Sequence, residues 1–455
     1  MLLGKSFEKF INGSPVTVML RGIIEWSFHA ERFDQLFEQH AQKQYRKDLP
    51  FSTVAEVIGE VVFNTQPSVG AGLQARAGEL PVSRKAFYNK LNGVEPQVAA
   101  ALVVDSAQQF LPVLEKLTPV NPPLLPGYEV RLLDGNHFAA TEHRLDVLRG
   151  ETAAPLPGQA LAVLDPDRRL VVDVIPCEDA HAQERTLLPD VLNRVQPGEV
   201  WIADRNFCTL GFLSGIMQCG GRFLIRHHAN MPYETAGKRK SLGRTATGHV
   251  SEQSVRVTDP ETGRVRKVRM IIVELDDATR DEDTVLRLLT NLPARDASAA
   301  RVAELYRHRW TIETMFQELT EHLTCEIKTL AYPQAAVLAF CLSLVAWNAL
   351  SVVLSALASA QGAETVRETV SGYYLSLEIS QVYHGMMIAV PSDEWKVFRG
   401  LTPSRLAQEL KRLARHVDLT KYQKHPRGAK TPQPPRRYSG NGQHVATARL
   451  LCRKT

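Results

Sequence analysis

The stretch "YRHRWTIETMFQEL", which begins at Tyr306, gathers cationic, acidic and aromatic side chains within a few helical turns. At about 100° per residue, Tyr306, Arg309 and Glu313 lie within about 60° of one another on a continuous helix. Apolar residues at helical spacing form a stripe beside this face. They are Leu305, Ile312, Phe316, Leu319 and Leu323. Glu313 is therefore expected at the border of the buried stripe.

Two interpretations of this helix are open. In the first, Arg309 and Glu313 form an i,i+4 ion pair on an ordinary solvated surface. In the second, the helix lines a nucleic-acid site, where Arg309 binds phosphate as a fork and Tyr306 stacks on or hydrogen-bonds to a nucleotide. Glu313 is the candidate carboxylate of such a site, because Glu318 is expected on the open side of the helix.

Two aspartates end predicted strands. Asp134 follows "VRLL", and Asp204 follows "VWIA". Aspartate often only closes a strand as a turn former. If the two strands are neighbours, however, their carboxylates meet at one edge of the sheet and repel each other unless a divalent cation neutralises them. Hard oxygen ligands suit Mg²⁺, and Glu313 as a third carboxylate would complete a two-metal site.

The spacing of apolar residues divides the chain into segments. Positions three and four apart predict a helical N-terminal domain, which we expect to bind DNA ends. After the proline-rich "TPVNPPLLPG", strand patterns predict an α/β core with a mixed sheet covered by helices. The predicted segments are a helical domain (1–120), the first part of the core (121–228), a β-rich insertion (229–290), the second part of the core (291–360), a helical C-terminal region (361–420) and a basic tail (421–455).

Residues 335–360 carry no charged side chain and are long enough to cross a bilayer. They also include Asn348 and several serines, and no second run of this kind is evident in the sequence. A helix that is apolar all round is equally what the centre of a large domain needs. We therefore expect a buried core helix and no association with a membrane.

The tail from Lys421 onward has nine basic residues and no acidic one, in a chain with a formal net charge of +5. This pattern is typical of an arm that neutralises an anionic polymer, although a solvated tail would look the same. The last thirty residues are rich in Pro, Gly and Arg, and we expect them to lack regular structure until bound.

Six cysteines at scattered spacings, without a CxxC pair, favour a reducing compartment over a disulfide or zinc framework. The start of the chain lacks the apolar run of a signal peptide. We expect a prokaryotic cytoplasmic protein that associates with the nucleoid when it is bound to DNA.

These motifs resemble those of the DDE transposases of the insertion sequence 4 family. Tyr306, Arg309 and Glu313 match the family's Tyr-Arg-Glu-Lys signature in spacing, but Thr320 stands where the family has lysine. "LLDGNHF" and "WIADRNF" resemble the two aspartate motifs, and "TNLP" also fits. The basic residue nearest to the missing lysine is Lys328.

The resemblance implies a ribonuclease-H-like core in which Asp134, Asp204 and Glu313 hold two Mg²⁺ ions, for which Mn²⁺ is a plausible substitute. It implies cut-and-paste transposition. One strand is cut at the transposon end, and the freed 3′-OH attacks phosphodiesters, through a DNA hairpin and then in strand transfer to target DNA. The partners would be terminal inverted repeats and target DNA, bound by a homodimer on two ends.

Further DNA contacts are expected from side chains around the site, on the basic insertion hairpin and in the tail. They are Arg205, Arg307, Trp310, Thr320, Lys267, Arg427, Lys430, Arg436 and Arg437. Two alternatives stay open at this point, a nuclease that cuts without joining and an inactive DNA-binding protein descended from a transposase.

Overall fold

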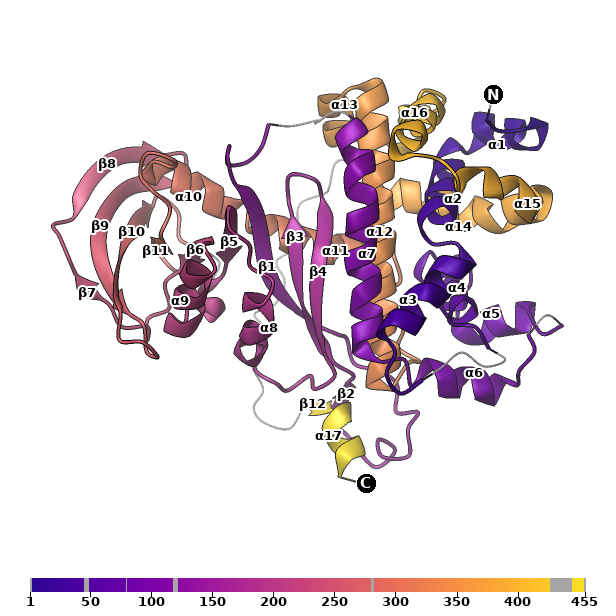
Figure 1. Cartoon of the computed structure of the whole chain (residues 1–455), viewed down its shortest axis with the longest axis horizontal. Coiled ribbons are helices and arrows are strands. Elements are labelled where there is room, and N and C mark those ends of the chain that lie inside the picture. Colours follow the sequence, from indigo (N-terminus) through magenta and orange to yellow (C-terminus); the bar gives the residue numbers. More distant parts are fainter. Residues whose placement is uncertain are drawn as a thin grey trace.

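The computed structural model describes residues 2–44, 49–78, 80–117, 122–279, 282–425 and 444–453. The chain is mixed α/β. A ten-stranded mixed sheet occupies one side of the molecule, and helices from both halves of the chain gather on the other (Figure 1). The long helices α7 and α12 lie between the strands and a group of helices from the two ends of the chain, among them α2, α4, α14 and α15, whereas α8, α9 and α10 lie beside the strands (Figure 1).

The N-terminal region is helical, as expected from its apolar spacing. Ser83 caps α6 by accepting a hydrogen bond from the backbone N–H of Ala86 at 3.2 Å. The elements are η1 (Lys5–Phe7), α1 (Glu8–Gly13), α2 (Pro15–Ser27), α3 (Ala30–His40), α4 (Phe51–Val62), α5 (Val69–Ala75), α6 (Arg84–Leu91) and α7 (Pro96–Lys116).

The sheet has the strand order β4-β3-β1-β5-β6-β11-β10-β9-β7, and β8 pairs with β9. Strands β1, β5 and β6 run parallel, whereas β3, β4 and the later strands pair antiparallel. The β-rich insertion therefore continues the same sheet. The strands are β1 (Glu129–His137), β2 (Ala154–Leu156), β3 (Gln159–Asp165), β4 (Leu170–Cys177), β5 (Glu199–Ala203), β6 (Arg222–Arg226), β7 (Glu234–Thr235), β8 (Lys240–Thr245), β9 (Gly248–Thr258), β10 (Val265–Leu275) and β11 (Val285–Thr290).

Helices connect and cover these strands. Between β4 and β6 they are η2 (Glu184–Leu187), α8 (Leu188–Leu192), η3 (Arg205–Phe207) and α9 (Leu210–Gln218). After β11 they are α10 (Ala299–Arg307), α11 (Trp310–His322), α12 (Pro333–Gln361), α13 (Ala363–Thr369), α14 (Gly372–Ala389), α15 (Ser392–Trp395), η4 (Lys396–Phe398), α16 (Pro403–Ala414) and η5 (Leu419–Tyr422).

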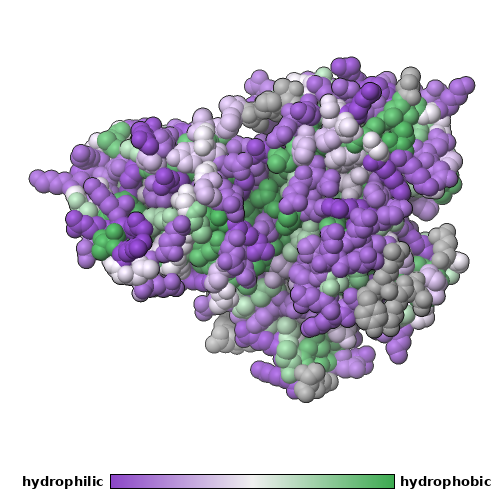
Figure 2. Space-filling view, viewed as in Figure 1, coloured by the Kyte–Doolittle hydropathy of each residue, from purple (hydrophilic) through white to green (hydrophobic). Residues whose placement is uncertain are grey.

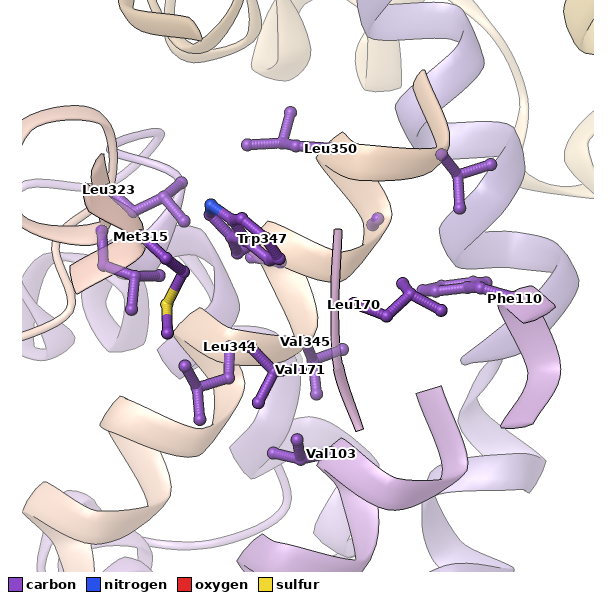
Figure 3. Close-up of a cluster of buried hydrophobic side chains, with 14 of the residues drawn as sticks. Val103, Phe110, Leu170, Val171, Met315, Leu323, Leu344, Val345, Trp347 and Leu350 are labelled. Atoms are coloured by element: carbon purple, nitrogen blue, oxygen red, sulfur yellow. The ribbon is translucent and has the colours of Figure 1, made fainter. Parts of the chain in front are cut away.

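The apolar helix α12 is a core element. Its most apolar window is 94% buried inside the protein. Helix α7 is also long and apolar enough to cross a membrane, contrary to the expectation that no second run of this kind exists, and 56% of its most apolar window is buried. Side chains of α12, α7 and β4 pack together in one cluster with Met315 of α11 and the adjoining Leu323 (Figure 3). Hydrophilic side chains cover most of the face shown in Figure 2.

The hydrogen bonds of Asn348 explain why this polar residue lies inside the apolar helix α12. Strand β4 is an edge strand, and Asn348 Oδ1 accepts a hydrogen bond from Val171 N at 2.8 Å while Nδ2 donates to Val171 O at 2.9 Å. Its Nδ2 also donates to Ser106 Oγ of α7 at 2.8 Å. The side chain therefore closes the free edge of the sheet and joins it to both long helices.

The C-terminal segment corrects one expectation. Residues 444–452 are ordered as β12 (His444–Ala446) and α17 (Thr447–Cys452), although no regular structure was predicted there. Strand β12 pairs in parallel with β2, and Arg449 forms an ion pair with Asp179 at 2.9 Å. The predicted DNA-contact residues Arg427, Lys430, Arg436 and Arg437 lie outside the described residues.

Candidate active site

The strand register places the two aspartates side by side. The parallel ladder between β1 and β5 ends at the pair Leu133–Ala203, and the next residues are Asp134 and Asp204. Neighbouring strands lie about 4.8 Å apart. Asp204 also caps η3, since its Oδ1 accepts a hydrogen bond from Asn206 N at 2.7 Å. The sheet thus brings two carboxylates from distant parts of the sequence to one edge.

The strand β1 is longer than predicted. Asp134 does not end it, because the residues up to His137 still pair with β3. Asp134 therefore marks the end of the parallel ladder with β5 but not the end of the strand. It is held on one side by β3, where it lies opposite Ala162.

Asp134 is in an environment that disfavours its charge. Burial, with the nearby charges of Asp204 and Glu313, raises its pKa to about 7, although Arg309 opposes this rise. Its side chain is 18% exposed. A carboxyl group with such a pKa lacks enough positive charge around it, which is expected where a cation binds.

Residues 306–319 do not form one continuous helix. Helix α10 ends at Arg307 and α11 begins at Trp310. Across the junction, His308 N and Arg309 N donate to the carbonyls of Leu305 and Tyr306, which are three residues back. The assumed constant 100° rotation from Tyr306 to Glu313 was therefore wrong, because the chain tightens into a turn between them. Arg309 and Glu313 nevertheless lie close together.

Arg309 is shared between the carboxylates. Its Nη1 lies 2.6 Å from Glu313 Oε1 and 3.5 Å from Asp134 Oδ2. The i,i+4 ion pair of the ordinary interpretation is thus present. It is not on a solvated surface, however, because the Arg309 side chain is only 11% exposed. Its Nε is buried and has no hydrogen-bond partner among the described residues.

Tyr306 lies beside this group but is 7% exposed. Burial raises its pKa to about 12, which Arg309 partly opposes. Its ring faces are therefore not available for stacking on a nucleotide in this arrangement. Of the two nucleotide contacts predicted for Tyr306, stacking and a hydrogen bond, the structure allows the hydrogen bond from its hydroxyl.

The junction of α10 and α11 also presents exposed side chains. Trp310 is 58% exposed, and the guanidinium of Arg309 lies 4.9 Å from its ring centroid. Arg307 is exposed as well. Both residues line an open cavity of about 940 Å³ between this junction and the insertion strands. An aromatic face and a cation in one cavity suit a nucleotide.

Three further predicted residues, Arg205, Thr320 and Lys328, lie at separate places in the structure. Arg205 is on η3, next to Asp204, and lies 3.8 Å from Asp283. Thr320 is exposed on α11, and its hydroxyl donates to Phe316 O at 3.1 Å. Lys328, the other candidate for the missing lysine, is exposed beyond the end of α11.

The basic strand β10 does not reach the carboxylates. The register from β10 through β11, β6 and β5 to β1 puts Arg269 level with Leu132. Lys267 therefore lies toward the N-terminal ends of the parallel strands, away from the ends that carry the aspartates. Arg269, on the same strand, binds Glu252 and the carbonyls of Leu292 and Ala297. A DNA contact by the exposed Lys267 would be remote from the aspartates.

The carboxylates of the site meet the needs of a divalent cation only in part. As placed, no three His, Cys, Asp or Glu side chains among the described residues gather closely enough to hold a metal together. Asp134 and Asp204 by themselves fit Mg²⁺, which is commonly bound by one or two carboxylates with water and phosphate oxygens. Glu313 is held by Arg309 instead.

One further carboxylate near the site, Glu184, was not predicted from the sequence. Glu184 of η2 accepts a hydrogen bond from Asn206 Nδ2 and lies near Asp204. It belongs to no recognisable motif, and only the fold brings it here.

Glu318, expected on the open side of α11, is instead tied to Arg169 at 3.0 Å and to Trp347 Nε1 at 3.1 Å. This supports the choice of Glu313 over Glu318.

The residues of this site lie in a region whose sequence matches a known family of domains. Residues 125–349 match the family model described as "Transposase DDE domain". A domain of this kind is a nucleotidyl-transfer enzyme that acts on DNA. The match includes Asp134, Asp204 and Glu313, and it confirms the expected DDE transposase domain.

One relative carries a corresponding name. The protein "Putative transposase y4zB" of Sinorhizobium fredii (strain NBRC 101917 / NGR234) is 28% identical over 131 residues, which are 28% of this chain and 35% of the relative. The chain thus spans about a third of the length of the curated relative that it matches.

Proposed function

We propose that this protein is a DNA transposase that cleaves transposon ends and joins them to target DNA. One observation carries the proposal. Asp134 and Asp204 stand side by side, one residue past the last parallel pair of β1 and β5, with Arg309 and Glu313 beside them. The transposase DDE domain match covers all four residues.

Asp134 and Asp204 would hold a divalent cation, and Glu313 would complete a site for two Mg²⁺ ions, with Mn²⁺ as a substitute. Bound cations would activate the attacking oxygen and stabilise the leaving oxygen of a phosphodiester. The raised pKa of Asp134 and the hard oxygen donors support this assignment.

Arg309 would change partners when DNA binds. In the protein alone it pairs with Glu313 and contacts Asp134, and so partly neutralises both. A phosphate offers a guanidinium the same bidentate geometry as a carboxylate, and the unpartnered Nε provides a further donor. DNA would therefore draw Arg309 from Glu313 and free that carboxylate for the cations.

The finer assignments rest on the resemblance to the insertion sequence 4 family. The order β4-β3-β1-β5-β6 with three antiparallel and then parallel strands is consistent with a ribonuclease-H-like core. Cut-and-paste chemistry through a DNA hairpin would use the cavity beside Trp310 for the distorted end. Thr320 in place of lysine would leave one phosphate contact uncharged.

The partners would be terminal inverted repeats and target DNA, bound by a homodimer on two ends. The protein would work in the prokaryotic cytoplasm, on the nucleoid when bound. The buried state of α12 supports an assignment without a membrane.

The test uses the inverted repeats that should flank the gene. A labelled repeat end is incubated with plasmid, Mg²⁺ and the protein, and both cleavage and strand transfer are measured. Asp204→Asn, which keeps an acceptor for the η3 cap, should lose cleavage but still bind the end. Cleavage without joining would favour a nuclease, and binding without cleavage by the wild type would favour an inactive DNA-binding protein. Cleavage retained by Asp204→Asn would refute the assignment of the carboxylates.

A further inference from the structure

Glu184 lies in the short helix η2, between β4 and α8, and reaches the turn that follows Asp204. Its Oε2 accepts a hydrogen bond from the side chain of Asn206. The next residue, Arg185, donates from Nε to the carbonyl oxygen of Asn206 at 2.6 Å. Two consecutive residues of η2 therefore hold both the side chain and the backbone of Asn206.

Asn206 in turn fixes Asp204. Its backbone N–H donates to Asp204 Oδ1 at 2.7 Å, which closes the η3 cap. The rotamer of Asp204 is thus tied through Asn206 to Glu184. A metal ligand that is oriented by such a hydrogen bond loses little conformational entropy when it binds.

Glu184 also lies against β1, the strand that carries Asp134. A Cβ on Gly135, the residue after Asp134, would lie 1.9 Å from Glu184 Oε1 and 2.7 Å from its Cδ. Gly135 has no positive φ, so a side chain there would conflict with the Glu184 carboxylate and not with the backbone conformation. The Glu184 carboxylate thus fits against β1 and holds the turn after β5 at the same time.

A structural role alone does not account for the charge. A neutral amide oxygen would accept the hydrogen bond from Asn206 equally well. The carboxylate instead adds negative charge beside Asp204, which already repels Asp134; burial raises the pKa of Glu184, and the hydrogen bond from Asn206 and the nearby His137 oppose that rise. Such added charge favours a cation at this edge of the sheet.

We infer that Glu184 is a positioning residue for the divalent-cation site, which orients Asp204 through Asn206 and raises the affinity of the aspartate pair for the cation. The inference rests on the proposed function, because it needs Asp134 and Asp204 to bind a cation. Gly135 provides the space that this carboxylate occupies.

The experiment measures Mn²⁺ binding to the purified full-length protein without DNA, by the electron paramagnetic resonance signal of free Mn²⁺. We expect Glu184→Ala to weaken binding about 10- to 100-fold, the range found for residues that orient metal ligands. Glu184→Gln, which keeps an acceptor for Asn206, should lose less. Asp190→Asn is the matched control, since it removes one negative charge from the exposed side of the adjacent α8 and should leave affinity within twofold.

A double-mutant cycle tests the contact with Gly135. Gly135→Ala should displace the Glu184 carboxylate and weaken Mn²⁺ binding about as much as Glu184→Ala. The double variant should be no weaker than either single variant, because both changes remove the same interaction. Additive losses would show that Gly135 acts independently of Glu184 and would overturn this part of the inference.

The outcomes separate the two proposals. If the wild type binds Mn²⁺ and Asp204→Asn does not, but Glu184→Ala and Glu184→Gln bind like the wild type, the role of Glu184 is refuted and the proposed function stands. If the wild type does not bind Mn²⁺, or Asp204→Asn binds it equally well, the cation site and the role of Glu184 fail together. Thermal unfolding of each variant shows whether a loss of affinity reflects loss of the fold.

Discussion

At the scale of single residues, the site contains its own counter-ion. Asp134 is largely buried and repelled by two other carboxylates, and Arg309 is the cation that contacts it. The same guanidinium pairs with Glu313 at 2.6 Å. One positive charge thus partly neutralises several negative ones, and the site favours any ligand that brings further positive charge.

The raised pKa of Asp134 predicts a pH-dependent stability. The folded-state pKa of about 7 is above the value near 3.9 of an unfolded chain, so folding favours the protonated form. Asp134 therefore destabilises the metal-free protein increasingly as the pH rises from about 4 to 7. Asp134→Asn should stabilise it by about 1–3 kcal/mol at pH 8 and change little at pH 4.5. Urea unfolding in EDTA at both pH values measures this, and an equal effect at the two values would contradict it.

Arg309 should matter for DNA as well as for the carboxylates. Arg309→Ala should weaken binding of the transposon end and lower the slope of log affinity against log salt by about one. Cleavage should fall more than binding, because Asp134 and Glu313 lose their shared partner. Arg307→Ala is the matched control, an arginine two residues away that is exposed and contacts neither carboxylate at salt-bridge distance. Equal cleavage by the two variants would exclude a special role for Arg309.

Thr320 permits a gain-of-affinity prediction. It lies two turns after Glu313 on α11, about 20° around the helix, and is exposed. Thr320→Lys should tighten end binding and steepen the salt dependence by up to about one unit. Thr314→Lys, on the same helix but about 100° away from Glu313, should do so less. If the two lysines act alike across a salt titration, Thr320 does not face the DNA backbone.

At the scale of elements, the structure differs from the helices and strands predicted from the sequence at particular residues. Apolar spacing predicted the helices α4 and α7, whose buried faces have that period, and a long uncharged run predicted α12, which is buried almost all round. Apolar spacing did not predict the break between α10 and α11, because the sequence there has no Pro or Gly and the local turn depends on tertiary contacts of Tyr306 and Arg309. The extension of β1 to His137 was missed for a similar reason, since its pairing partner is the distant strand β3.

Asn348 gives an element-scale prediction. Asn348→Leu removes the partner of both Val171 backbone groups and of Ser106 at once. Buried polar groups without partners are costly, so we expect a loss of about 2–4 kcal/mol in the free energy of unfolding. Ser351→Ala is the control, because its buried hydroxyl donates only to the Trp347 carbonyl of the same helix. Urea unfolding compares them, and a loss no larger than that of Ser351→Ala would show that the β4 edge does not need Asn348.

At the scale of the whole molecule, the sequence could supply the carboxylates but not their surroundings. Asp134 and Asp204 were recognisable because each follows an apolar strand pattern, and the mixed sheet followed from the order of those patterns. Glu184 and the return of β12 to β2 were not, because each depends on which strands are neighbours. The remoteness of Lys267 from the aspartates also follows only from the register across several strands.

In the C-terminal region, the contribution of the tail's positive charge to DNA binding can be tested separately from the attachment of β12 and α17 to the rest of the chain. Arg427, Lys430, Arg436 and Arg437 carry charge in the tail, whereas Arg449 is paired with Asp179 on the catalytic part of the chain. Replacing the four tail residues with Gln should make the salt dependence of end binding shallower by up to about 3–4 units, since each phosphate contact contributes about 0.9. Cleavage at saturating protein should be retained, because the carboxylates are untouched.

Arg449→Gln serves as the control for that variant. Its charge is already neutralised by Asp179, so its loss should leave the salt slope unchanged while weakening the attachment of β12 and α17. Fluorescence anisotropy of a labelled end at several salt concentrations gives both slopes. If Arg449→Gln flattened the salt dependence as much as the four-residue variant, DNA would be bound by the docked segment and not by the charged tail before it.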